Sequence, residues 1–121
     1  MQARRVLIVE DDPMVALDLE EIVLGLAEGR AQVAHVASVR EAERALAQSV
    51  FDVALLDIDV LDGKTYDLAA ALHASGLPFA FISGSRPDEL PPGLRMVPFV
   101  PKPYDPAEIE HTLRARLSPP T

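Results

Sequence analysis

The sequence contains no cysteine, which excludes disulfide bonds, thiolate metal sites and thiol catalysis. It also lacks an excess of positive charge, because 19 acidic residues stand against 11 lysines and arginines and give a formal net charge of −8. A protein that binds nucleic acid on its own usually carries the opposite sign. We therefore predict that the chain has no nucleic-acid partner.

Long apolar runs are missing as well. The N-terminal stretch MQARRVLIVEDD has two arginines before an apolar run, but this run is short and ends in three acids, which is not the pattern of a signal peptide. No segment approaches the roughly 20 apolar residues of a membrane span. We expect a cytoplasmic protein with no membrane partner.

What the sequence does contain is an alternation of short apolar runs and segments with helical spacing. The runs predict five strands, at Val6–Val9, Gln32–Val36, Val53–Leu56, Phe79–Ile82 and Val97–Val100. Helix starts are indicated by the capping pattern Ser38-x-x-Glu41 and by Asp105-Pro106. Strands joined by helices predict an α/β fold, a five-stranded parallel sheet with helices on both faces, flavodoxin-like, in one domain over residues 1–121.

The segment Ser85–Met96 interrupts this regularity. Its prolines at 91 and 92 cannot lie in a helix interior, because proline has no N–H and its ring clashes with the preceding turn. The sequence therefore predicts a shortened fourth helix of one or two turns around Pro87–Leu90, followed by an extended Pro-Pro-Gly segment.

Chemically active side chains follow four of the predicted strands. Glu10 and Asp11 follow the first strand, Asp57 the third, Ser83 the fourth and Lys102 the fifth. In open parallel sheets the ligand site lies at the carboxyl ends of the strands, so these side chains are expected to meet. Taken alone, the acids at 10–12 could equally well cap the following helix.

Clustered carboxylates require positive charge to offset them. A pair of like charges at about 4 Å costs on the order of 4 kcal/mol at an effective dielectric constant of 20. Lys102 supplies one positive charge, and Mg²⁺, which prefers oxygen ligands, would supply the rest. Asp57 could then act as a carboxylate nucleophile toward phosphorus, with Ser83 donating a hydrogen bond to a phosphoryl oxygen.

The segments VLIVEDDP, VALLDID, FISG and VPKPY together resemble the receiver domains of two-component response regulators over essentially the whole chain. The resemblance implies that Asp57 is the phosphoacceptor and that a histidine kinase is the phosphodonor. It implies a phosphorylation switch without an output domain, which acts on a downstream protein partner or a phosphotransfer protein. Such a receiver is not a turnover enzyme, although it catalyses its own phosphorylation and dephosphorylation.

The same resemblance assigns the remaining site residues. Asp11 would bind Mg²⁺ directly, Glu10 would act on it through water, and the backbone carbonyl of Asp59 would be a further ligand beside Asp57. Ser83 and Phe99 would be the switch residues. The peptide bond between Lys102 and Pro103 would be cis.

The chain departs from many receivers in the loop after Asp57, where Leu61 replaces a proline and Gly63 comes earlier than their glycine, so a shorter loop is expected. This loop resembles a subgroup of single-domain receivers with the signature Phe-Ala-Thr-Gly-x-Tyr. The corresponding segment here is Phe81-Ile82-Ser83-Gly84-Ser85-Arg86.

Two other functions remain open. One is an interaction module that keeps the fold but does not signal by phosphate, which an intact set of site residues disfavours. The other is a phosphatase with an aspartyl nucleophile, for which Asp59 has the spacing of a general acid, although the chain has no segment that would serve as a lid over a substrate.

Overall fold

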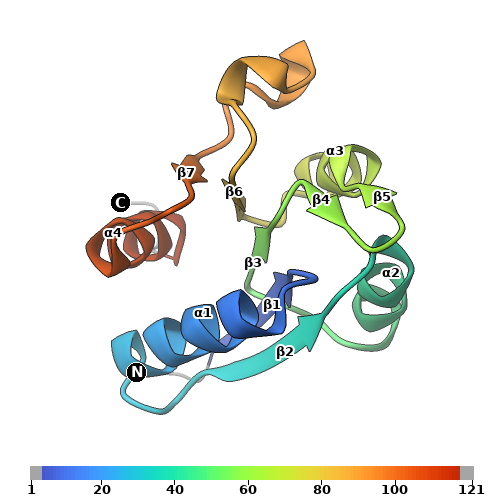
Figure 1. The fold of residues 1–121 in the computed structure, drawn as a ribbon. Coiled ribbons are helices and arrows are strands. Elements are labelled where there is room, and N and C mark those ends of the chain that lie inside the picture. Colours follow the sequence, from blue (N-terminus) through green and yellow to red (C-terminus); the bar gives the residue numbers. More distant parts are fainter. Residues whose placement is uncertain (1–3, 118–121) are drawn as a thin grey trace.

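The centre of the molecule is a parallel sheet with the strand order β2-β1-β3-β6-β7 (Figure 1). The computed structural model describes residues 4–117, so both ends of the predicted domain lie outside the described part. The strands are β1 (Arg5–Val9), β2 (Gln32–Val36), β3 (Val53–Leu56), β6 (Phe79–Ser83) and β7 (Phe99–Pro101). The predicted α/β sheet is confirmed, and β2 and β3 have the predicted bounds.

Helices cover both faces of the sheet (Figure 1). Helices α1 (Pro13–Leu26) and α4 (Pro106–Leu117) lie on one face, and α2 (Val39–Gln48) and α3 (Tyr66–Ser75) lie on the other. Each face has its own apolar core, because alternate residues of the buried strands point to opposite sides. Among the described residues, no helix is long and apolar enough to cross a membrane.

Local sequence signals explain where the helices begin and end. The side chain of Asp12 accepts hydrogen bonds from the N–H groups of Met14 and Val15 and so caps α1. Ser38 caps α2 through the N–H of Glu41. At the start of α4, the Asp105 side chain accepts from the N–H of Ala107, and the Glu108 side chain accepts from the N–H of Asp105. Helix α3 ends at Gly76, whose φ of 77° is a left-handed conformation that glycine adopts without strain.

The connection between β6 and β7 differs in part from the prediction. It contains two short 3-10 helices, η1 (Pro87–Glu89) and η2 (Pro92–Leu94), and no α-helix. The expected extended Pro-Pro-Gly segment is therefore wrong beyond Pro91, because Pro92 occupies the first turn of η2, where no N–H is needed. Leu90 and Leu94 are buried in the core beside α3 and hold this connection to the domain.

A short hairpin after β3 was not predicted at all. It consists of β4 (Asp59–Val60) and β5 (Gly63–Lys64), which pair in antiparallel fashion. Its turn carries Asp62, whose carboxylate accepts hydrogen bonds from the N–H groups of Val39 and Arg40 at 2.7 and 3.1 Å. The hairpin thus caps α2 from outside that helix.

Candidate functional site

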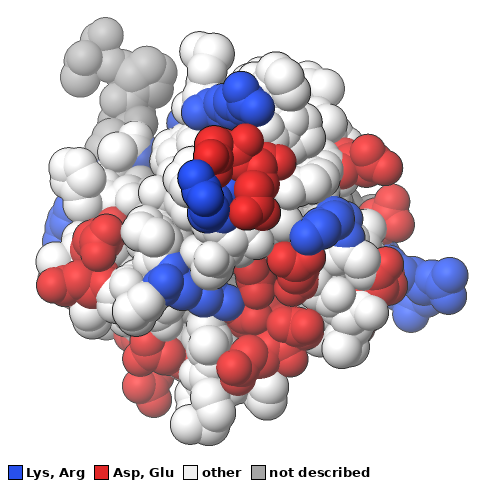
Figure 2. All heavy atoms as spheres, turned by 45° about the horizontal axis from the view of Figure 1, so that its top comes forward, with Lys and Arg blue, Asp and Glu red and all other residues white. Residues whose placement is uncertain are grey.

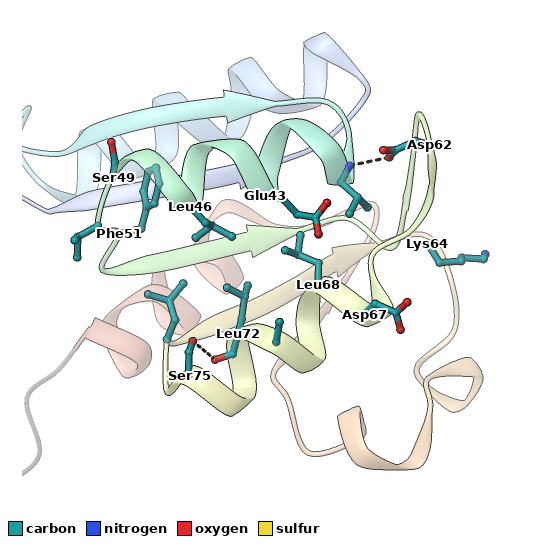
Figure 3. Close-up of a pocket in the computed structure, with 14 residues that line it drawn as sticks. Glu43, Leu46, Ser49, Phe51, Asp62, Lys64, Asp67, Leu68, Leu72 and Ser75 are labelled. Atoms are coloured by element: carbon teal, nitrogen blue, oxygen red, sulfur yellow. Dashed lines mark hydrogen bonds between the residues drawn. The ribbon is translucent and has the colours of Figure 1, made fainter.

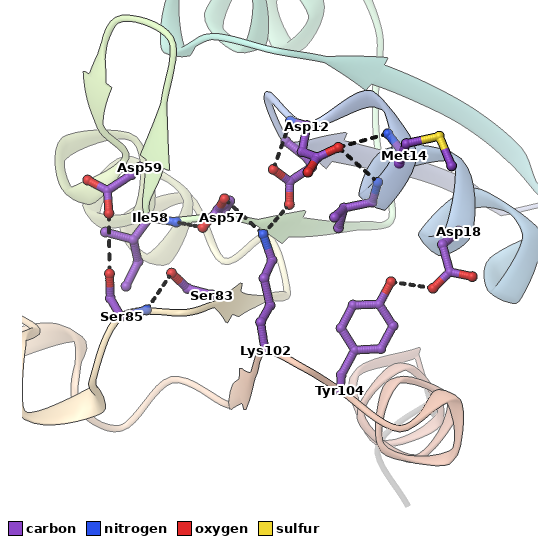
Figure 4. A network of polar contacts seen from close by, with 12 residues as sticks. Asp12, Met14, Asp18, Asp57, Ile58, Asp59, Ser83, Ser85, Lys102 and Tyr104 are labelled. Atoms are coloured by element: carbon purple, nitrogen blue, oxygen red, sulfur yellow. Dashed lines mark hydrogen bonds and ion pairs between the residues drawn. The ribbon is translucent and has the colours of Figure 1, made fainter.

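The residues that follow β1, β3 and β7 are placed by the sheet itself. The N–H of Glu10 donates to the carbonyl of Val36, and the N–H of Asp57 donates to that of Val9, both at 2.9 Å. The N–H of Lys102 likewise donates to the carbonyl of Ser83 at 2.9 Å. The parallel ladders therefore extend past the strand ends and bring these side chains to one edge of the sheet (Figure 4).

Lys102 joins the two buried carboxylates of the site. Its Nζ atom lies 2.5 Å from Oε1 of Glu10 and 3.0 Å from Oδ2 of Asp57. Burial raises the pKa of Glu10 to about 7, against the hydrogen bond from Lys102. Burial would lower the pKa of Lys102, but its hydrogen bonds to Glu10 and Asp57 raise it above the ordinary value. The lysine therefore stays charged and offsets only part of the negative charge around it.

Carboxylate oxygens of Glu10, Asp11 and Asp57 lie within 4.8 Å of one another, and they form the one such group in residues 4–117. A hard divalent cation bound through oxygen atoms and water fits this donor set, and Mg²⁺ is the common choice for few carboxylates. The chemistry of the three residues thus matches the predicted metal site.

The side chains of Asp12 and Asp59 make contacts outside the carboxylate cluster. Asp12 caps α1, while its N–H donates to Oε2 of Glu10 at 3.1 Å, so the helix-capping alternative holds for Asp12 and not for Glu10. The Asp59 carboxylate forms an ion pair with Lys64 and accepts a hydrogen bond from Ser85. Its side chain is thus turned to the hairpin and to Ser85, which leaves its backbone carbonyl as the predicted ligand.

The predicted switch residues lie beside this cluster. Ser83 is buried, and its Oγ accepts a hydrogen bond from the N–H of Ser85 at 3.2 Å. No acceptor for the Ser83 hydroxyl proton is found among the described residues, so this proton is available to a ligand. Phe99 is half-buried, with its ring centroid 6.4 Å from that of Phe81. The bond between Lys102 and Pro103 is cis, in agreement with the resemblance.

Two contributions to the site were missed from the sequence. Thr65 is fully buried, and its Oγ1 donates to the backbone carbonyl of Asp57 at 2.7 Å, which fixes the chain just after β3. Tyr104, which follows the cis bond, donates to Asp18 on α1 at 2.5 Å and ties the Lys102 loop to that helix (Figure 4). Neither contact has a signal in the sequence, because each joins residues that only the folded chain brings together.

A flavodoxin-like parallel sheet that carries an acidic cluster and a lysine at its carboxyl edge defines the receiver class of α/β proteins. The family model for the response regulator receiver domain matches residues 6–114. The chain therefore belongs to the response regulator receiver family, which serves signal transduction in two-component systems.

Solved structures of similar proteins support the same fold. The receiver domain of the PhyR response regulator from Erythrobacter litoralis is 28% identical, with a TM-score of 0.83, over 100% of this chain and 98% of that one. SdrG from Sphingomonas melonis Fr1 is 30% identical, with a TM-score of 0.78, over 96% and 98%. PhyR from Brucella abortus is 29% identical, with a TM-score of 0.79 over 95% of this chain, which spans only 48% of that protein. No curated protein matches the sequence.

Proposed function

We propose that the chain is a phosphorylation switch in which Asp57 takes a phosphoryl group from a phosphohistidine of a histidine kinase. The observation that carries this proposal is the meeting of Asp57 with Lys102 and with the carboxylates of Glu10 and Asp11. The phosphorylated form would bind a downstream protein or a phosphotransfer protein differently from the free form.

In the proposed reaction, a carboxylate oxygen of Asp57 forms a bond to phosphorus while the bond from phosphorus to the kinase imidazole nitrogen breaks. The imidazole keeps the electron pair of that bond and takes a proton. Glu10, Asp11, Asp57 and the backbone carbonyl of Asp59 would hold Mg²⁺, which when bound neutralises charge on the phosphoryl oxygens. Lys102 and the free hydroxyl proton of Ser83 are available to the same oxygens.

Phosphorylation would add about −1.5 to −2 charges and three acceptor oxygens at Asp57. Ser83 would turn its hydroxyl to the new group, and Phe99, which contacts the neighbouring Phe81, would follow. Because these residues lie on β6 and β7, the change would reach the surface formed by β7 and the η1–η2 connection.

The phosphatase alternative is disfavoured by the surroundings of Asp59. A general acid must be protonated near neutral pH, which requires a raised pKa. The hydrogen bond and charge of Lys64 instead lower the pKa of Asp59 below its ordinary value. Asp59 is therefore poorly suited to protonate a leaving group.

The proposal is tested by incubating the protein with Mg²⁺ and ³²P-labelled acetyl phosphate. We expect stable label on the wild type, none on Asp57→Asn, and label on the matched control Asp59→Asn, which changes a neighbouring carboxylate that faces away from the cluster. Labelling of Asp57→Asn would refute the phosphoacceptor assignment. Rapid release of phosphate with no retained label would instead favour a phosphatase.

A further inference from the structure

A groove of about 700 Å³ lies between α2 and α3, on the molecular face opposite to α1 and α4 (Figure 3). In this view Leu46 on α2 faces Leu68 and Leu72 on α3, and Phe51 closes one end. Val50, which also lines the groove, has 83% of its surface exposed. Leu68, Leu72 and Phe51 belong to the buried core, so the apolar surface that the groove leaves exposed comes from Val50 and from the partly exposed Leu46 and Leu77.

The rim of the groove is acidic at one end. Glu43 on α2, Asp62 at the hairpin turn and Asp67 on α3 lie together near the hairpin, and Phe51 lies at the opposite end (Figure 3). Lys64 is the one base among the lining residues, but it pairs with Asp59, and its side chain extends away from the groove. Arg40 offsets part of the charge of Asp62, so the groove combines an apolar surface with negative charge that comes mainly from Glu43 and Asp67 at one end.

We propose that this groove is a docking site for a basic amphipathic helix of a partner protein. Such a helix would place an apolar stripe on Leu46, Val50 and Leu77 and its lysines or arginines beside Glu43 and Asp67, in the manner of helix-in-groove recognition. A second copy of this chain fits the site less well, since its net charge of −8 would be repelled by the acidic rim.

The test uses the unphosphorylated full chain, so its result does not depend on whether Asp57 accepts phosphate. The probe is a synthetic leucine–lysine helix of about 20 residues, above the length at which isolated helices are marginal in water, titrated into ¹⁵N-labelled protein. We expect amide shift changes along α2, α3 and the hairpin. A leucine–glutamate helix of the same pattern should not bind.

Two variants measure separately how much the acidic rim and the apolar surface of the groove contribute to binding. Glu43→Gln with Asp67→Asn should weaken binding of the basic helix about tenfold, since each exposed ion pair contributes up to about 1 kcal/mol. Val50→Asn should weaken it about fivefold by loss of apolar contact. The control for the charge variant is Glu21→Gln with Glu110→Gln, which changes the net charge by the same amount on the opposite face. The control for the apolar variant is Met96→Asn, at a residue that is 94% exposed and lies outside the groove. Both controls should bind the basic helix with unchanged affinity.

Four outcomes of the peptide titrations would overturn the proposal. These are no binding of the basic helix, equal binding of the acidic helix, equal weakening by the two double variants, and shift changes centred on Glu10–Asp12 in place of the groove. Concentration-dependent dimerisation of the chain alone, abolished by Val50→Asn, would identify a second copy as the occupant and would also overturn it.

Discussion

At the scale of single residues, Asp11 carries the least compensated charge of the site. Glu10 and Asp57 share Lys102, whereas the Asp11 side chain has no hydrogen bond or ion pair among residues 4–117. We predict that Asp11→Asn raises the melting temperature of the metal-free protein by a few degrees, because it removes repulsion on the order of 1 kcal/mol.

The same variant should lose the stabilisation that Mg²⁺ gives the wild type by binding the folded state. Thermal unfolding with and without Mg²⁺ measures both effects. Asp12→Asn is the matched control, because asparagine also caps helices and the side chain lies outside the cluster. A wild-type melting temperature that does not respond to Mg²⁺ would contradict the metal site.

The hydrogen bond of Tyr104 makes the stability of the folded protein depend on pH in the alkaline range. Burial, followed by the hydrogen bond to Asp18, raises the pKa of Tyr104 above its ordinary value. The folded state therefore holds the phenol proton more tightly than the unfolded chain does. Its contribution to stability is complete below the unfolded pKa near 10 and is lost as the pH rises through the higher folded pKa.

We predict that the wild type loses stability between about pH 9 and 11 more steeply than Tyr104→Phe, as measured by urea unfolding at each pH. Tyr66→Phe should keep the wild-type slope, since the hydrogen bond to Asp18 is intact in it. Identical slopes in wild type and Tyr104→Phe would show that this bond is absent in solution.

How much of the site the sequence could predict depends on whether the order of the strands fixes the position of each residue. The cluster of Glu10, Asp57 and Lys102 was predictable because each follows an apolar run whose end the parallel topology fixes. The donation from Thr65 to the Asp57 carbonyl was not predictable, since no periodicity relates a buried hydroxyl to a carbonyl eight residues earlier. The switch role of Phe99 was assigned by family resemblance alone, and it stays a prediction that this side chain moves on phosphorylation.

At the scale of elements, the hairpin after β3 is the part that the sequence reasoning missed. An Asp-Gly pair signals a hairpin when it fills the two central turn positions, but here these positions hold Leu61 and Asp62, and Gly63 follows as the first residue of β5 with a φ of 128°. The flanking strands are only two residues long, too short for an alternating pattern to be recognised. The 3-10 turn at Pro92–Leu94 was missed because proline excludes a helix interior but not a first turn.

The start of α2 depends for its stability on Asp62, a residue of the hairpin that lies outside this helix. Hydrogen bonds from the N–H groups of Val39 and Arg40 lower the pKa of Asp62. A lowered folded pKa means that the stabilisation is present above the unfolded pKa near 4 and is lost as the pH falls. We predict that Asp62→Ala lowers the melting temperature at neutral pH and speeds hydrogen exchange at Val39 and Arg40.

In acid, where Asp62 is protonated, Asp62→Ala should become equal in stability to the wild type. Leu61→Ala, at the neighbouring exposed turn position, is the control and should leave both amides protected. Unchanged exchange at Val39 and Arg40 in Asp62→Ala would contradict the capping role.

At the scale of the whole molecule, charge and connectivity determine what the protein presents to partners. Acidic side chains form a continuous patch on the face drawn in Figure 2, with lysines and arginines scattered around it. A net charge of −8 favours basic protein partners and supports the prediction that nucleic acid is not one of them.

A chain of contacts leads from Ser83, beside the proposed phosphoacceptor Asp57, to α2. The N–H of Ser85 donates to Ser83, and the hydroxyl of Ser85 donates to Asp59 in the hairpin, each at 3.2 Å. Asp59 pairs with Lys64 across the hairpin, and Asp62 at its turn caps α2. A displacement of Ser83 toward a phosphoryl group would therefore pull on the hairpin and on the first turn of α2.

We predict that beryllofluoride with Mg²⁺ shifts the amide signals of Val39 and Arg40 in the wild type, and that Ser85→Ala largely removes this response while Asp57 still takes label from acetyl phosphate. Substitutions within such networks change coupling by about 0.5–2 kcal/mol. Thr112→Ala on α4 is the control and should respond like the wild type. A full response in Ser85→Ala would mean that the signal does not pass through this hydroxyl, whereas loss of labelling in that variant would mean that Ser85 serves the phosphorylation site itself.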